Sequence, residues 1–237
     1  MKKNPKITII IPTYEREKML IDCLFAINKQ TCGRDKFEVR VIDDATPNSD
    51  VKKSKVLANH FDFELSYTVQ EKGGPAKARN LGAQNAKGEI IVFLDDDTLP
   101  DKEWLSELVK ALENSDFDGV GGITENVKNE TLSEKLLHHI DHLISPIDPK
   151  SGEITFLVTV NAAFYKKAFD EVGGFDEGFK LPSGEDIDLG YRMRTQGFKF
   201  GHARKALVYH HQRDTLKSMF KNWYNYGQGI YRCQVKH

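Results

Sequence analysis

The chain has 237 residues, 39% hydrophobic and 29% charged, which is the composition of an ordinary soluble globular protein and excludes a disordered chain. Its 34 Lys and Arg residues almost balance its 35 Asp and Glu residues, so nothing suggests bulk attraction to nucleic acid. Cys23, Cys32 and Cys233 form no CxxC pair, which argues against a thiolate metal site or a disulfide framework and favours a reducing compartment.

The first apolar run of the chain is too short to be a targeting segment. Residues 1–5 are basic, but Ile7 to Ile11 is followed at once by Pro12, so we interpret the run as a strand rather than a signal peptide. No run along the chain approaches the length of a membrane-spanning helix. The chain length fits one large domain, or one domain with a subdomain.

Apolar runs and helical periodicity alternate in the N-terminal part of the chain. We predict strands at Lys6–Ile11, Phe37–Ile42, Glu64–Val69 and Ile90–Leu94. Between them we predict helices at Glu17–Ile27, Val51–Phe61 and Ala76–Ala86. Strands that alternate with helices predict parallel pairing and a layered α/β fold. The turn after the first strand lacks GxGxxG, so a pyrophosphate would have to be held in some other way.

The C-terminal part is predicted to continue with a helix at 101–113, a strand at Gly119–Asn126, a helix at Leu132–Ile144, and strands at Thr155–Val160 and Ala206–Tyr209. The helix at Leu132–Ile144 carries His138, His139 and His142. Because no acid completes an HExxH motif, we interpret these histidines as solvated positions rather than zinc ligands. A further helix is predicted to begin at Glu185 and Asp186, where the helix dipole favours ionised carboxylates.

Three consecutive carboxylates follow the most apolar strand. Ile90–Leu94 runs into Asp95, Asp96 and Asp97, and Leu99–Pro100 is expected to end any strand there. Ligands of open α/β sheets bind at the carboxyl ends of the strands, and three crowded acids repel one another unless a cation lies between them. We therefore predict a Mg²⁺ or Mn²⁺ site completed by phosphate oxygens and water, the alternative being a solvated acidic turn.

Six short motifs follow one another along the chain, at Ile10–Tyr14, Ile42–Asp44, Ala78–Gly82, Phe93–Asp97, Gly173–Glu177 and Gly184–Leu189. In this order they resemble the family-2 inverting nucleotide-sugar glycosyltransferases of the GT-A fold. The resemblance implies a Rossmann-like α/β fold, with a mixed, mostly parallel sheet flanked by helices. It also implies a catalytic domain at 1–214, with a nucleotide-binding half at about 1–101 and an acceptor-binding half at 102–214, followed by a helical tail at 215–237.

The resemblance assigns the nucleotide contacts to the first half of the chain. Pro12, Thr13 and Tyr14 match the loop that lies against the nucleotide base. Asp44 matches the acid that accepts a hydrogen bond from the base, usually uracil, although an Asx-turn before Pro47 would also explain it. Arg79 matches a basic residue near the base and the diphosphate, where a guanidinium suits phosphate geometry.

The resemblance places the chemistry at the acidic motifs. Asp96 matches the residue facing the ribose, and Asp97 matches the metal-binding acid of the DxD motif Asp95–Asp97. Asp186 matches the general base of a Glu-Asp motif. Asp95 and Glu185, the neighbours of these acids, are predicted to bind substrate. His210 or His211 lies where relatives often supply a metal ligand, with ordinary packing as the alternative.

These residues imply a metal-dependent inverting transfer of a sugar from a nucleoside diphosphate, UDP by expectation, to a hydroxyl of a saccharide or lipid-linked glycan, as in polysaccharide synthesis for the cell envelope. Mn²⁺ or Mg²⁺ would stabilise the leaving diphosphate, and Asp186 would take the acceptor proton. A polyprenol-phosphate glycosyltransferase is the alternative, and a noncatalytic sugar-nucleotide-binding module is less favoured. A haloacid-dehalogenase-type phosphatase is disfavoured, because Leu99 stands at the second position after Asp97 and the acids fall mid-chain.

The tail from Thr215 to His237 combines apolar residues at helical spacing with basic residues, and no acid follows Asp214. Such a helix suits a membrane interface, whereas packing on the catalytic domain is the alternative. For Leu216–Trp223 we favour packing, and for the end of the tail we favour the membrane surface. The expected location is therefore the cytoplasm, with peripheral contact to the inner face of the plasma membrane.

Overall fold

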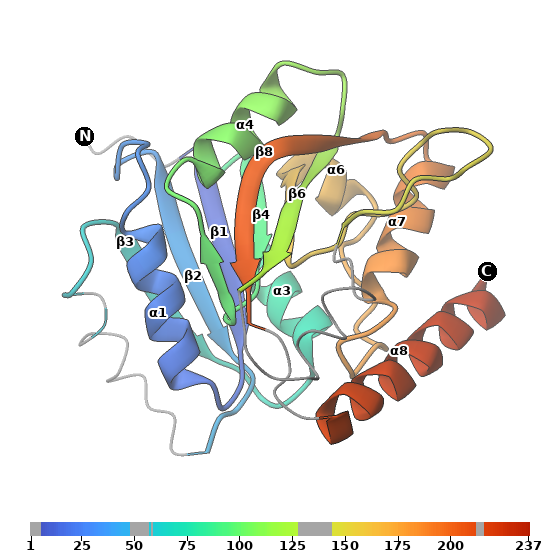
Figure 1. Cartoon of the computed structure of the whole chain (residues 1–237), viewed down its shortest axis with the longest axis horizontal. Coiled ribbons are helices and arrows are strands. Elements are labelled where there is room, and N and C mark those ends of the chain that lie inside the picture. Colours follow the sequence, from blue (N-terminus) through green and yellow to red (C-terminus); the bar gives the residue numbers. More distant parts are fainter. Residues whose placement is uncertain (1–5, 48–56, 58, 128–143, 212–215) are drawn as a thin grey trace.

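The computed structural model describes residues 6–47, 57, 59–127, 144–211 and 216–237, and it arranges their strands in one sheet (Figure 1). The strand order is β3-β2-β1-β4-β7-β6-β8-β5. The strands are β1 Ile7–Thr13, β2 Phe37–Asp43, β3 Glu64–Val69, β4 Ile90–Leu94, β5 Thr98–Pro100, β6 Gly119–Asn126, β7 Asn161–Tyr165 and β8 Phe200–His210. The helices are α1 Glu17–Ile27, α3 Pro75–Gln84, α4 Trp104–Glu113, α6 Lys166–Glu171, α7 Glu185–Thr195 and α8 Leu216–Lys236.

Most strand pairs of the sheet are parallel, as the alternation of strands and helices predicts. β1 pairs in parallel with β2 and with β4, β2 with β3, and β6 with β8. β7 is antiparallel to β4 and β6, and β5 is antiparallel to β8. The expected mixed, mostly parallel sheet of the GT-A fold is therefore confirmed.

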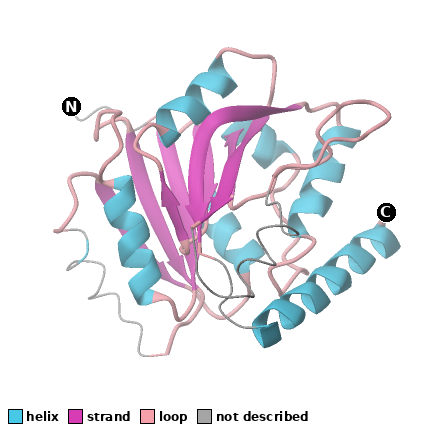
Figure 2. Ribbon diagram, viewed as in Figure 1, coloured by secondary structure: helices cyan, strands magenta, loops and turns pink. Residues whose placement is uncertain are grey.

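The sheet is buried between helices on both faces, as Figure 2 shows. Side chains of successive strand residues point to opposite faces, so Ile9 and Ile11 of β1 pack with α1 and α4 while Ile10 packs with α3. Trp104 of α4 is fully buried on the first face, and Phe93 of β4 packs against the aromatic rings of the second. Burial on both faces explains why these strands read as unbroken apolar runs.

One edge of the sheet collects the ends of strands from the whole chain. β1, β2 and β4 end there at Thr13, Asp43 and Leu94, and β8 ends there at His210. β7 runs the other way, so it begins at the same edge with Asn161, which is paired with Leu94. Polar residues just beyond these ends are brought together because parallel strands share one carboxyl edge.

Two predictions about strands are wrong. Thr155–Val160 is not a strand, since the backbone N–H of Thr159 donates to the carboxylate of Asp186 rather than to a neighbouring strand. The strand is the next segment, β7, whose two alanines give a weak strand signal. Leu99–Pro100 also does not prevent a strand, because β5 is at the edge of the sheet, where proline needs no ladder partner.

The remaining predicted elements agree with the structure or lie outside the described residues. β8 begins at Phe200 and is therefore longer than the strand predicted at Ala206–Tyr209. The predicted helices at Val51–Phe61 and Leu132–Ile144 fall largely outside the described residues, as do the three histidines of the second helix. The tail is the helix α8, which contacts α7 (Figure 1). Lys236 and His237 contact Asp188 of α7, so the end of the tail is attached to the domain where we expected a membrane surface. Phe220, in the part expected to pack, is instead 61% exposed. No helix in the described ranges combines the length and hydropathy that a membrane crossing requires.

Candidate active site

Two adjoining cavities open at the carboxyl edge of the sheet. Their volumes are about 340 and 320 Å³, and we call them the first and the second cavity. Residues from the ends of β1 and β2 and from the start of α3 line the first cavity. Residues from the loop before β7, the start of α7, the end of β8 and one face of α8 line the second. Both cavities are lined by Arg16, Arg79, Asp95 and Pro182, so they form one continuous site.

The first cavity contains the residues predicted to contact the nucleotide base. Pro12, Thr13 and Tyr14 leave the end of β1 along its wall, and Asp44 follows the end of β2. Lys72, which the motifs do not single out, places its ammonium 3.0 Å from the centre of the Tyr14 ring. An ammonium over an aromatic face is an attractive pair, and here it brings positive charge to the mouth of the cavity.

Asp44 is held by the glycine loop that precedes α3. One carboxylate oxygen accepts from Gln70 Nε2 at 2.8 Å and from the backbone N–H of Gly73 at 2.7 Å, and the other accepts from Gly74 N–H at 3.0 Å. The alternative interpretation of Asp44 as an Asx-turn residue is wrong. The backbone N–H of Thr46, two residues after Asp44, donates instead to Asp43 Oδ1, at 2.7 Å.

Arg79 of α3 lies between two carboxylates. Its Nη1 donates to Glu185 at 2.9 Å and its Nη2 donates to Asp95 at 2.8 Å, with only 4% of the arginine side chain exposed. Burial lowers the pKa of Arg79, but Asp95 and Glu185 outweigh burial and raise it, so the guanidinium stays charged. Arg79 thus ties α3 to the end of β4 and to the start of α7.

Asp96 and Asp97 are both paired with Arg16. Nη1 of Arg16 donates to Asp96 Oδ1 at 3.0 Å and to Asp97 Oδ2 at 2.6 Å. Thr13 also donates to Asp96, at 2.7 Å. Burial raises the pKa of Asp96 to about 6, against the opposing effect of Arg16. Sequence reasoning missed Arg16, although a basic residue two positions after Tyr14 could have been matched to the acidic run.

The structure distinguishes the two histidines at the end of β8. His210 lines the second cavity, and its Nε2 is 3.3 Å from Asp97 Oδ1. His211 donates its backbone N–H to the Asp97 carbonyl, at 2.9 Å, and its side chain lines neither of the two cavities. The structure therefore brings His210, and not His211, beside the predicted metal-binding acid.

The donor set around Asp97 fits a divalent cation that is shared with a ligand. A carboxylate and an imidazole lie side by side, and carboxylate oxygens suit Mn²⁺ and Mg²⁺. Within the described part of the chain, no three His, Cys, Asp or Glu side chains form a metal-binding group of their own. Phosphate oxygens and water would have to complete the shell, which is how nucleotide-bound Mg²⁺ is usually held.

Glu185 and Asp186 begin α7 at the rim of the second cavity. Asp186 accepts from the backbone N–H of Thr159 at 3.0 Å and from its hydroxyl at 2.9 Å, which fixes both carboxylate oxygens. Burial raises the pKa of Asp186, and Arg79 opposes this rise. Burial, together with the charge of Asp186, raises the pKa of Glu185 to about 7, again against Arg79.

Two motifs that are far apart in the sequence are joined by hydrogen bonds next to the site. The side chain of Asn80, in the Ala78–Gly82 motif, donates to the carbonyl of Phe175 at 2.9 Å and accepts its N–H at 2.9 Å. Phe175 belongs to the Gly173–Glu177 motif, and its ring packs on Phe93 at the end of β4. Sequence reasoning assigned no role to Asn80, because the motif itself does not show which loop the amide faces.

A sheet of this topology, with an acidic cluster at its carboxyl edge beside a cavity of about 340 Å³, is typical of the class of GT-A glycosyltransferases. The model of the glycosyl transferase family 2 matches residues 8–173, and a second model, described as the N-terminal domain of galactosyltransferase, matches residues 138–214. The chain belongs to glycosyl transferase family 2. The resemblance of the six motifs is thereby confirmed.

Similar sequences carry glycosyltransferase names. Glycosyltransferase AglE of Haloferax volcanii is 26% identical over 222 residues, covering 92% of this chain and 71% of AglE. The poly(ribitol-phosphate) beta-N-acetylglucosaminyltransferase TarS of Staphylococcus aureus is 29% identical over 169 residues, covering 68% of this chain but 29% of TarS. The chain thus spans 71% of the length of AglE and 29% of the length of TarS.

Solved structures share the fold. TarS residues 1–349 of S. aureus, in complex with UDP, align with a TM-score of 0.70 at 22% identity, covering 87% of this chain and 60% of that one. The mannosyltransferase PcManGT of Pyrobaculum calidifontis, in complex with GDP-Man and Mn²⁺, aligns with a TM-score of 0.68 at 24% identity, covering 93% and 60%. At these identities the likeness concerns the fold.

Proposed function

We propose that the protein is a metal-dependent, inverting glycosyltransferase that moves a sugar from a nucleoside-diphosphate sugar to a hydroxyl of a saccharide or glycan. One observation carries this proposal: Asp186 faces the same cavity as Asp97 and His210. A carboxylate suited to take the acceptor proton and side chains suited to hold a diphosphate-bound cation thus line one cavity, which supports the proposal. A noncatalytic binding module would have no use for this combination.

The first cavity is proposed to hold the nucleotide, with UDP as the expected donor. Asp44 lines this cavity, and a carboxylate has about four lone-pair positions, so it can accept a base N–H in addition to its three bonds from residues 70–74. TarS was solved with UDP and PcManGT with GDP-Man, so relatives of this fold take either uridine or guanosine donors. A screen of sugar nucleotides by thermal stabilisation would identify the base and the sugar.

The proposed reaction is a single displacement at the sugar C1. A divalent cation held by Asp97 and His210, Mn²⁺ or Mg²⁺, would stabilise the negative charge of the diphosphate. Asp186 takes the proton of the acceptor hydroxyl, whose oxygen forms the new bond to C1 as the bond to the phosphate oxygen breaks. The two bonds from Thr159 hold the Asp186 carboxylate in one orientation for this transfer. Attack from the face opposite the diphosphate inverts the anomeric centre.

The two halves of the chain are proposed to divide these tasks within one catalytic domain, residues 1–214. Residues 1–101 contribute most of the lining of the first cavity and the acidic cluster. Residues 102–214 contribute Asp186, Thr159 and His210 to the second. The single sheet passes through both halves, so the division is one of function rather than of separate folding units.

Replacing Asp186 by asparagine tests the proposal. Asp186→Asn keeps the shape and part of the bonding to Thr159 but accepts no proton, so turnover is expected to fall by roughly 10²–10⁴-fold while donor affinity stays within about twofold. Transfer rates and donor binding by calorimetry measure the two quantities separately. Near-normal turnover by Asp186→Asn would show that another group is the base, and Glu185 or Asp188 would then be tested.

A surface stripe of α8 is proposed to contact an anionic membrane on the cytoplasmic side. Phe220, Tyr224 and Tyr231 lie on one side of the helix and are 61%, 68% and 69% exposed, and Lys217 and Lys221 share this side. Exposed aromatic residues next to lysines suit a lipid interface. Sedimentation with anionic liposomes, comparing wild type with Phe220→Ser/Tyr224→Ser/Tyr231→Ser, tests this, since equal sedimentation of both proteins would refute the contact.

A further inference from the structure

One face of α8 forms a wall of the second cavity. Asn222, Tyr226 and Ile230 all line it, together with Asp186 and His210. Their spacing of four residues places the three side chains on one side of the helix. Residues of the tail thus share a reaction space with the proposed base and the proposed metal ligands, although the two family models end before the tail.

The C-terminal half of α8 is packed closely on the loop before α7. A Cβ atom at Gly229 would lie 2.2 Å from Ser183 Oγ, and one at Gly184 would lie 2.6 Å from the Gly229 carbonyl, so the two backbones touch. Gly184 also has φ = 87°, a conformation that favours glycine. Cys233 Sγ donates to the Gly184 carbonyl at 3.0 Å, which extends the contact by another turn.

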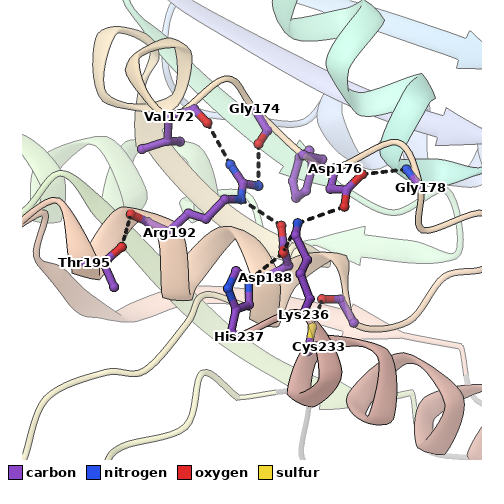
Figure 3. Close-up of polar contacts among 12 residues, drawn as sticks. Val172, Gly174, Asp176, Gly178, Asp188, Arg192, Thr195, Cys233, Lys236 and His237 are labelled. Carbon is purple, nitrogen blue, oxygen red and sulfur yellow. Dashed lines mark hydrogen bonds and ion pairs between the residues drawn. The ribbon is translucent and has the colours of Figure 1, made fainter.

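A charged cluster fixes the end of α8 to α7, as Figure 3 shows. Asp188 is fully buried and accepts from Lys236, from His237 at 2.9 Å and from Arg192 at 2.8 Å. Burial raises the pKa of Asp188, but these partners outweigh it and lower the pKa, so the carboxylate stays ionised. Lys236 also donates to Asp176 at 2.8 Å. The wall formed by α8 is therefore held at a fixed position relative to Asp186.

Beyond the position proposed for the cation at Asp97 and His210, the second cavity suits a neutral sugar ring better than a further phosphate group. Its charged lining consists of four carboxylates and two guanidinium groups, from Arg16, Arg79, Asp95, Asp97, Glu185 and Asp186. Both guanidinium groups are already paired with these carboxylates. The remaining wall combines aromatic and aliphatic side chains, including Phe156 and Tyr226, with the amide of Asn222. Apolar surface with a few polar groups matches a pyranose, which has C–H faces and a rim of hydroxyls.

We propose that α8 forms the acceptor subsite, in which Tyr226 packs against the ring of a neutral pyranoside acceptor and Asn222 hydrogen-bonds its hydroxyls. This inference rests on the proposed function and adds to it both the residues and the acceptor class. A polyprenyl phosphate, the alternative acceptor, would place an anion among carboxylates whose neighbouring cations are already engaged. The C-terminal cluster around Asp188 then acts by positioning this wall, without touching the acceptor.

Saturation-transfer NMR measures acceptor binding without turnover. The protein is saturated with UDP and Mg²⁺, because paramagnetic Mn²⁺ would broaden the ligand signals. It is then titrated with methyl pyranosides of glucose, galactose, mannose and N-acetylglucosamine, and separately with farnesyl phosphate. We expect at least one pyranoside to bind and farnesyl phosphate not to bind. Tyr226→Ala is expected to raise the pyranoside Kd by about tenfold or more, and Tyr226→Phe is expected to retain binding because the ring remains. Calorimetry with UDP is expected to give the same affinity for every variant.

Tyr224→Ala is the matched control, because Tyr224 is on the same helix two residues away and is 68% exposed. Tyr224→Ala is expected to bind UDP and the pyranoside with the same affinities as the wild type. Equal pyranoside binding by Tyr226→Ala and the wild type, binding of farnesyl phosphate alone, or no pyranoside binding at all would overturn the inference. If the wild type does not bind UDP, the proposed function is contradicted. The pyranoside titration is then repeated without nucleotide, so that the acceptor subsite is tested separately.

Discussion

At the scale of single residues, the acidic cluster after β4 balances its charges within the chain. Arg16 pairs with Asp96 and Asp97, and Arg79 pairs with Asp95 and Glu185. A divalent cation near Asp97 would neutralise part of the negative charge of Asp96 and Asp97, which Arg16 neutralises in this structure. Arg16 is therefore expected to hold the cluster together when no cation is bound.

Replacing Arg16 by glutamine tests this interpretation. Arg16→Gln removes the guanidinium that two buried carboxylates share, so stability in EDTA should fall by about 1–3 kcal/mol. This range is reduced because 30% of the arginine side chain is exposed to solvent. Mn²⁺ should restore more stability to Arg16→Gln than to wild type, as measured by urea unfolding. Lys110→Gln, at an exposed pair, is the control. Equal stabilisation of Arg16→Gln and wild type by Mn²⁺ would contradict this role.

Glu185 gives a pH-dependent prediction. Its pKa is about 7 in the fold against an ordinary value of 4.5, so the folded state holds the proton more tightly than the unfolded state. The protein should therefore lose stability as pH rises from about 4.5 to about 7, and Glu185→Gln should show a smaller loss, part of which remains because the pKa values of Asp96 and Asp186 are raised as well. Unfolding in urea at pH 5 and pH 7.5 measures the difference, expected to be on the order of 1–3 kcal/mol. A parallel pH dependence of both proteins would contradict it, and exposed Glu64→Gln is the control.

Sequence reasoning identified most residues of the site but not their partners. The residue types and the order of the motifs indicate Asp44, Asp97 and Asp186, because acids after apolar strands and at a helix start are visible in the sequence. The contacts of Arg16 and Thr159 with these acids depend on the folded arrangement of segments about 30 to 80 residues apart, which no local pattern encodes. His210 and His211 likewise become distinguishable only once β8 fixes which ring faces the cavity.

At the scale of elements, the long parallel strands are predictable because burial on both faces leaves continuous apolar runs. β7 is not, because its strand identity comes from pairing with β4 and β6 rather than from its own alanine-rich sequence. The tail could be predicted as a helix from its periodicity. Which of its sides packs on the domain depends on Ser183 and Gly184, and the sequence does not show this contact.

Alanine substitutions at two glycines of α8 test the contact between α8 and the loop at Ser183, because they are expected to change the stability of the protein in opposite directions. Alanine favours a helix over glycine by about 1 kcal/mol, so Gly227→Ala, with nothing within 4 Å of its added Cβ, should stabilise the protein or leave it unchanged. Gly229→Ala should destabilise it by about 1–3 kcal/mol, because its Cβ would meet the backbone of Ser183 at 2.5 Å. Thermal and urea unfolding compare the two. Stabilisation by both substitutions would show that α8 does not pack on this loop.

At the scale of the whole molecule, one sheet edge gathers the site from every part of the chain. Seven elements of the described chain meet at this edge, namely the ends of β1, β2, β4 and β8 and the starts of α3, α7 and β7. One face of α8 lines the second cavity there. The family and the layered α/β architecture follow from the order of motifs and the alternation of elements. The joining of a nucleotide-sized cavity to a second cavity beneath the tail follows only from the three-dimensional fold.

The central claim is that donor binding depends on a cation held at Asp97 and His210. Calorimetric titration with UDP, in Mn²⁺ and in EDTA, tests it most directly on wild type, Asp97→Ala, His210→Ala and the control His211→Ala, whose side chain lines neither of the two cavities. We expect Mn²⁺ to tighten UDP binding by at least about tenfold in wild type and His211→Ala, and by much less in Asp97→Ala and His210→Ala. Equal affinity of the wild type for UDP in Mn²⁺ and in EDTA would contradict the claim.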